Sequence, residues 1–101
     1  AAFVNPFVVG DVLTYSWGYD QTNVEAFQVV GVTKASVKLR RIAITEVRAT
    51  GSMSSMVKPV PGKFLDEKVS THRVTVDGYI SMAFGIAQKW SGRELYQSWY
   101  A

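Results

Sequence analysis

A chain of 101 residues can form one domain with one modest core, and its 48% hydrophobic and 19% charged residues fit an ordered globule. The absence of cysteine excludes disulfides, thiolate catalysis and cysteine-based zinc sites, and it suits a reducing cytoplasm. The net charge of +3 identifies no partner, no apolar run reaches the ~18 residues that span a membrane, and no secretion leader opens the chain. We therefore expect a cytoplasmic protein without a membrane partner.

The first half of the chain contains three strand-like segments. Residues 8–15 and 24–32 are rich in β-branched and aromatic side chains. Residues 36–47 alternate between apolar and polar until Arg40 and Arg41, where the apolar positions change face. This slip predicts a bulge near the two arginines, or a bend where the strand moves between two halves of a sheet.

The second half is more irregular. Residues 48–62 are small, flexible and without hydrophobic period, so we expect a mobile loop there. Residues 63–68 fit either one helical turn or extended chain. Residues 69–76 resume strand character, with Val74 and Val76 predicted to point inward.

The chain closes with two further strand candidates, residues 79–89 and 94–100, joined by a predicted hairpin turn at residues 90–93. No sustained helical period or internal repeat is present. The predicted fold is all-β, either a small SH3-like barrel or a strongly bent antiparallel sheet of about 5–7 strands. We expect it to form a single domain over residues 1–101.

The loop between the first two strands, residues 16–23, carries two large aromatic residues in polar surroundings. Trp17 and Tyr19 could fold back as a lid over the core, or they could face a partner. A loop that only reverses the chain needs neither. Their polar neighbours in the same loop, Asp20, Gln21 and Asn23, belong to the candidate surface.

Positive charge is concentrated in the middle of the chain. Residues 34–63 contain seven Lys and Arg against Glu46, which gives this stretch +6 and leaves −3 for the rest. Such asymmetry can form a basic face for phosphate backbones or for an acidic protein. It can equally protect a solvated strand edge against self-pairing. Lys38, Arg40 and Arg41 are the candidate binding cations.

No combination of residues indicates catalysis. His72 is the single histidine, so a multi-histidine metal site is impossible, and its neighbours form no recognisable motif. The carboxylates are scattered, and no nucleophile elbow, P-loop or dinucleotide fingerprint is present. We predict a non-enzymatic protein without a metal or other cofactor.

Aromatic residues and cations together favour a binding role. Trp90 and Tyr96 in the last part of the chain join the aromatic loop as candidates. Aromatic faces beside Lys and Arg suit single-stranded nucleic acid, because bases stack and phosphates need cations. The same residue types form hot spots in protein interfaces, so the sequence leaves both partners open.

Five segments carry a resemblance to small, mostly uncharacterised proteins of tailed bacteriophages and related mobile elements. The most specific is the Ser-Trp-Gly-Tyr-Asp-Gln-Thr-Asn loop of residues 16–23. The others are Gly10-Asp11, residues 27–30, residues 37–40 and the Trp-Ser-Gly … Ser-Trp-Tyr-Ala ending of residues 90–101. The resemblance covers both ends and most of the first half, whereas residues 48–71 match no known pattern. It implies the cytoplasm of an infected bacterium and a protein that redirects host machinery or defence. It assigns no residue a role.

The leading hypothesis is therefore a phage-type binding protein that engages a host protein or a nucleoprotein complex, for host takeover or counter-defence. The alternatives are a small β-barrel that binds nucleic acid directly and a minor structural protein of the phage particle. A homodimer is left open, because an edge strand or the aromatic C-terminus could pair across a two-fold axis.

Overall fold

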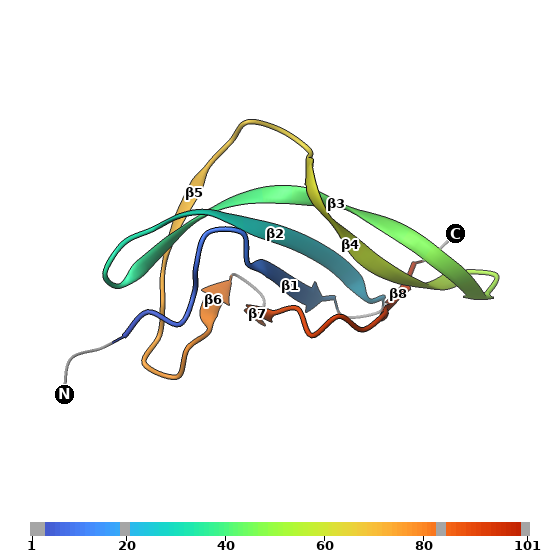
Figure 1. Ribbon diagram of the computed structural model, residues 1–101. Coiled ribbons are helices and arrows are strands. Elements are labelled where there is room, and N and C mark those ends of the chain that lie inside the picture. Colours follow the sequence, from blue (N-terminus) through green and yellow to red (C-terminus); the bar gives the residue numbers. More distant parts are fainter. Residues whose placement is uncertain (1–3, 19–20, 83–84, 100–101) are drawn as a thin grey trace.

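The computed structural model describes residues 4–18, 21–82 and 85–99, and these ranges contain β-strands and no helix (Figure 1). Eight antiparallel strands form one sheet that does not close, in the order β6-β7-β1-β2-β3-β4-β8, with β5 beside β3. The all-β prediction is confirmed, and the strands outnumber those expected. They are β1 (Val12–Trp17), β2 (Asn23–Val32), β3 (Ser36–Gly51), β4 (Ser54–Phe64), β5 (Ser70–Arg73), β6 (Ile80–Met82), β7 (Gly85–Lys89) and β8 (Leu95–Ser98).

The long strand β3 has two successive partners along one edge. Residues 36–39 pair with β5, and the pairing with β4 begins at Ile42. Arg40 and Arg41 lie between the two partners, so the slip in alternation marks the transition between two halves of the sheet. The irregularity in the β2–β3 ladder lies next to them, between Val29 and Gly31 of β2.

One hydrophobic core lies among β1, β2, β3, β6 and β7 and is completed by the N-terminal arm. Asn5 holds this arm in place, because its side-chain amide donates to the carbonyl oxygens of Thr33 at 2.9 Å and Ser36 at 3.1 Å. The buried members of this first core are Phe7, Leu13, Tyr15, Val29, Val37, Leu39, Val74, Ile80 and Ala87.

A second buried group lies on the opposite face of β2. Phe27 packs against the first core, so its neighbour Ala26 projects to the other side of the strand. Ala26 is directly opposite Ile42 on β3, and β4 and β8 lie against β2. The members of this second core are Val24, Ala26, Ile42, Ser55 and Val57.

Residues 48–62 differ from the expected loop, because they form most of a β-hairpin. The end of β3 pairs with β4 up to Gly51 opposite Ser54. The small polar residues of this segment show no hydrophobic period. They can still form the β3–β4 ladder, because its hydrogen bonds join backbone groups. The prolines of β4 lie near an interruption of the ladder, where Ile42 pairs with Phe64 but Ile44 pairs with Pro59. Strands accept proline at such irregularities.

Three smaller expectations also differ from the structure. Residues 65–69 form an irregular connection, so the helical turn left open there is absent. Val74 is buried as predicted, but Val76 is 89% exposed because the strand ends before it. The turn at residues 90–93 joins no hairpin, since β7 pairs with β1 and β6 while β8 pairs with β4.

Candidate binding surfaces

Trp17 ends β1 and lies partly buried against the first core. Its indole Nε1 donates to Oε2 of Glu25 at 2.7 Å, and Arg41 Nη2 lies 3.3 Å from the other carboxylate oxygen. A charged acceptor strengthens the first of these contacts. The arrangement favours the lid interpretation for Trp17. Tyr19 and Asp20 lie outside the described residues.

The other predicted members of the aromatic loop serve the turn itself. Gln21 Nε2 donates to Oδ1 of Asn23 at 3.3 Å, and both side chains are half-buried. Asn23 is the first residue of β2 and pairs with Trp17 at the end of β1. These polar groups therefore stabilise the β1–β2 connection.

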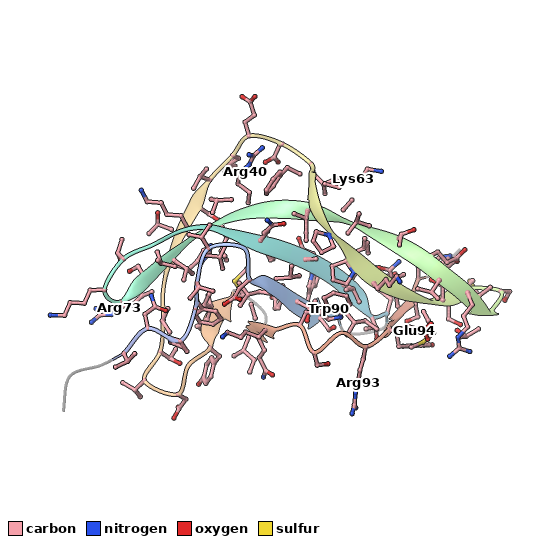
Figure 2. The ribbon with its side chains drawn as sticks, in the orientation of Figure 1. Arg40, Lys63, Arg73, Trp90, Arg93 and Glu94 are labelled. Carbon is pink, nitrogen blue, oxygen red and sulfur yellow. The ribbon has the colours of Figure 1, made fainter. Side chains whose placement is uncertain are left out.

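The three predicted cations do not share one surface. Arg41 is on the same face of β3 as Leu39, where it pairs with Glu25, whereas Lys38 and Arg40 are on the opposite face. Arg40 donates to the carbonyl oxygen of Asp66, at 2.6 Å from Nη2 and 3.2 Å from Nε. Its guanidinium also lies 4.0 Å from the centre of the Phe64 ring. Figure 2 shows Arg40 beneath the β4–β5 connection.

A different set of cations is free on the outer face of β3 and β5. Lys38 pairs with Thr71, so Lys38 and Arg73 project from the same face of adjacent strands. Lys34 is exposed in the preceding turn, and none of these three forms an ion pair with another described residue. Arg73 could not be identified beforehand, because the pairing of β5 with β3 has no local sequence signal. We call Lys34, Lys38 and Arg73 the basic strip.

Trp90 and Tyr96 are in separate places. Trp90, labelled in Figure 2, is half-buried and donates its indole N–H to the carbonyl oxygen of Arg93 at 2.8 Å. It also lines a groove of about 540 Å³. The groove's polar groups include Thr14, Ser16 and Gln88. Tyr96 is 50% exposed on β8.

Tyr96 is one of four large apolar residues near the end of the β3–β4 hairpin. It is directly opposite Met56 in the β4–β8 ladder, and the backbone N–H of Trp99 donates to the carbonyl oxygen of Met53 at 3.0 Å. Met53 is 40% exposed and Trp99 is 39% exposed. We call Met53, Met56, Tyr96 and Trp99 the Met-aromatic patch. Met56 and Tyr96 share one face of the ladder, and Met53 and Trp99 lie just beyond its last pair, Ser54 with Ser98.

A pocket of about 320 Å³, lined by both apolar and polar residues, opens where the sheet fails to close. His72 Nε2 lies 3.0 Å from Ser70 Oγ in this pocket, and burial lowers the pKa of His72. Asp66 also lines it, but its Oδ1 accepts a hydrogen bond from the backbone N–H of Lys68 at 2.9 Å. The charged or titratable groups of this inner pocket are Arg41, Asp66, Lys68 and His72.

Within the described ranges, no three Asp, Glu or His side chains come together in a way that could hold a metal ion. These ranges also contain no helix long and apolar enough to cross a membrane. Comparisons with protein-family models, with curated proteins and with solved structures found no match.

Proposed function

We propose that this protein is a non-enzymatic, phage-type binding protein that engages a host protein, alone or within a nucleoprotein complex, in the bacterial cytoplasm. The observation that carries the proposal is the Met-aromatic patch. Aromatic residues and methionine are enriched in protein interfaces, and methionine adapts to the shape of a partner. A role in redirecting host machinery or defence fits the resemblance to proteins of tailed phages.

The proposed contact is at the opposite end of the molecule from β5 and involves strands rather than the first loop (Figure 1). Trp17 already has an intramolecular partner and packs on the core, whereas Tyr96 leaves half its surface in solvent. An exposed side chain on a paired strand is held in place before binding, so less conformational freedom is lost in the complex.

An SH3-like barrel is part of the same proposal. The isolated bridge between Val74 and Ile80 supports it, because this bridge connects the β5 end of the sheet to β6. Within the described ranges, the hydrogen bond from the Thr75 N–H to the Tyr79 carbonyl oxygen lies beside this bridge, and no longer ladder joins β5 to β6. In a barrel, the β5 end of the sheet and β6 would meet along a seam. Loops and pockets would lie beside that seam, as they do in small β-barrels.

Affinity capture from bacterial lysate tests the function. The tagged protein, with and without nuclease, is compared with the Tyr96→Ala/Trp99→Ala double variant by mass spectrometry. We expect one specific protein to be captured also after nuclease treatment, and we expect the double variant to capture about tenfold less of it or even less. The matched control is Val32→Ala, which alters an exposed apolar residue outside the patch.

Equal capture by the double variant would contradict the role of the patch. Circular dichroism of each variant separates loss of binding from loss of folding. Loss of every captured protein after nuclease treatment would favour nucleic acid as the partner.

The basic strip favours nucleic acid as the second candidate partner. Lys38 and Arg73 lie on one face without carboxylate partners, which leaves both free to contact phosphates. Binding to a short labelled single-stranded DNA should weaken with salt, by about 0.7 units of log–log slope per neutralised phosphate. Lys38→Ala/Arg73→Ala should lower the slope by about 1.4, whereas Lys58→Ala on β4 should leave it unchanged. A flat salt response would remove this candidate.

A further inference from the structure

Two grooves adjoin on the face of β7 that points away from the first core. Strands β6, β7 and β1 lie side by side (Figure 1), and Ala87 of β7 belongs to the first core. Its neighbours Ile86 and Gln88 therefore project to the opposite face of the strand. One groove, of about 540 Å³, is lined by Trp90, and the other, of about 490 Å³, is lined by Tyr79. Gln88 lines both, so the grooves meet at its side chain, and we call the two together the β7 groove.

An aromatic residue lines each half of the β7 groove. The backbone N–H of Trp90 donates to the carbonyl oxygen of Val12 at 2.8 Å, which continues the β1–β7 ladder by one step and places Trp90 on the same face as Gln88. The hydrogen bond from the indole N–H to Arg93 holds the ring in place, so little conformational freedom is lost when a ligand packs on it. Tyr79, which directly precedes β6, lines the neighbouring half.

Uncharged polar side chains surround Trp90 in its half of the groove. They are Thr14, Ser16, Gln88 and Ser91. Within the described ranges, none of these four side chains makes a hydrogen bond, so three hydroxyl groups and one carboxamide are available to a ligand. Each of these groups can both donate and accept, which suits a ligand whose own polar groups are hydroxyls.

The charges of the β7 groove disfavour an anionic ligand. Among the described residues that line it, Lys89 and Asp77 carry a charge. The Nζ of Lys89 donates to the carbonyl oxygen of Pro6 at 2.6 Å and lies 3.5 Å from Oδ2 of Asp11, so its charge is offset. Asp77 has no ion-pair partner in the described part of the chain. Its carboxylate repels phosphate and carboxylate groups, whereas it accepts hydrogen bonds from hydroxyl groups.

We propose that the β7 groove binds a neutral oligosaccharide. A sugar ring carries hydroxyl groups around its edge and C–H groups on its faces, so it needs both hydrogen-bonding groups and aromatic surface. Trp90 packs against one sugar ring while Gln88 and the hydroxyl groups bind its edge, and Tyr79 and Asp77 contact the adjoining unit. A nucleic-acid strand could also stack on the aromatic rings, but its phosphates would find no unpaired cation among the described residues of the groove.

The β7 groove and the Met-aromatic patch are on different faces of β8. Leu95 lines the groove and is directly opposite Val57 of the second core, whereas its neighbour Tyr96 projects to the other face. The oligosaccharide site therefore does not depend on the proposed function.

A glycan array probed with the labelled full chain tests the proposal. We expect neutral oligosaccharides to bind, and those that carry carboxylate, phosphate or sulfate groups to give signals about fivefold weaker or less. The neutral oligosaccharide with the strongest signal is then titrated into the isotope-labelled full chain and followed by NMR. The indole N–H signal of Trp90 should shift, whereas that of Trp99 in the Met-aromatic patch should stay in place.

Two variants of the groove are then compared with the wild type by isothermal titration calorimetry, using the same oligosaccharide. Trp90→Ala should weaken binding about tenfold. Its matched control, Trp99→Ala, should stay within about twofold, which also separates this site from the proposed function. Gln88→Ala should weaken binding about fivefold, and because Gln88 is exposed its replacement need not disturb folding.

Three results would overturn the proposal. The first is an array on which no neutral oligosaccharide binds, or on which acidic ones bind equally well. The second is an unchanged Trp90 indole signal, or an unchanged Kd in folded Trp90→Ala and Gln88→Ala. The third is a shift of the Trp90 signal that a short single-stranded DNA causes and neutral oligosaccharides do not, which would make nucleic acid the ligand of the groove.

Discussion

Single residues determine how the connection after β1 is formed. Gly18 has a φ of 133°, and a Cβ added there would collide with the backbone oxygen of Gln21. Gly62 also has a positive φ, 81°, but a Cβ added there would meet open space. An alanine at position 18 would therefore have a strained backbone and would also collide with its surroundings, whereas an alanine at position 62 would have only the strained backbone.

We predict that Gly18→Ala lowers the free energy of unfolding by ~2 kcal/mol or more, and that Gly62→Ala lowers it by ~1 kcal/mol. Urea denaturation of both variants and the wild type measures the difference. Equal losses for the two variants would show that the connection relaxes around the added methyl group.

The pKa of His72 predicts a response of stability to acid. Burial lowers this pKa in the folded protein, so the unfolded chain binds a proton at higher pH than the folded one. The contribution of neutral His72 is thus complete above the unfolded value of about 6.5 and is lost as pH falls through the folded value. Between about pH 7 and pH 5, the wild type should lose more stability than His72→Gln. Parallel unfolding curves across this range would contradict the prediction.

For single residues, the hydrogen-bond and ion-pair partners of side chains were the feature that the sequence predicted least well. Trp17 and Arg41 were chosen from the sequence as separate surface candidates, yet Glu25 joins them. Arg40 likewise bonds to Asp66, 26 residues away. Residue type identifies a group that can form such contacts, but its partner depends on the register between strands.

At the level of elements, hydrophobic alternation was a reliable guide wherever one face of a strand is buried. The predicted 24–32 and the start of 36–47 agree closely with β2 and β3. The β3–β4 hairpin was missed because the end of β3 is exposed, so burial imposes no pattern on it, and because the buried positions of β4 include Ser55 and Pro59, which do not read as hydrophobic strand formers. Backbone pairing needs no such pattern, and Gly51 opposite Ser54 suffices to close the turn.

Hydrogen exchange distinguishes this hairpin from the mobile loop that the sequence indicated. Amides of residues 55–57, which pair with β3 on one side and β8 on the other, should exchange about tenfold or more slowly than those of Asp66, Glu67 and Val69 in the 65–69 connection. The irregular 65–69 connection is the internal reference within the same sample. Similar exchange rates in both segments, after correction for the intrinsic exchange rate of each amide, would mean that the hairpin opens freely.

The whole molecule has an arrangement that the sequence did not reveal: two buried groups on opposite faces of the β2–β3 pair. The sequence indicated one modest core, since alternation shows that a face is buried without showing what covers it. Along β2, Ala26 belongs to one core and Val29 to the other; along β3, Leu39 and Ile42 divide in the same way. Neither core can form without both strands.

We therefore predict that the two cores unfold together, although the molecule is elongated, with extents of 49 × 25 × 23 Å. Amide NMR signals of Leu13 in the first core and Val57 in the second should disappear at the same urea concentration. Leu39→Ala and Ile42→Ala should each lower the unfolding free energy by ~2–5 kcal/mol and shift both signals equally. Val47→Ala, on the exposed end of β3, is the control and should change it by less than ~0.5 kcal/mol. A Val57 signal lost at lower urea than that of Leu13 would mean that β4 and β8 detach while the first core persists.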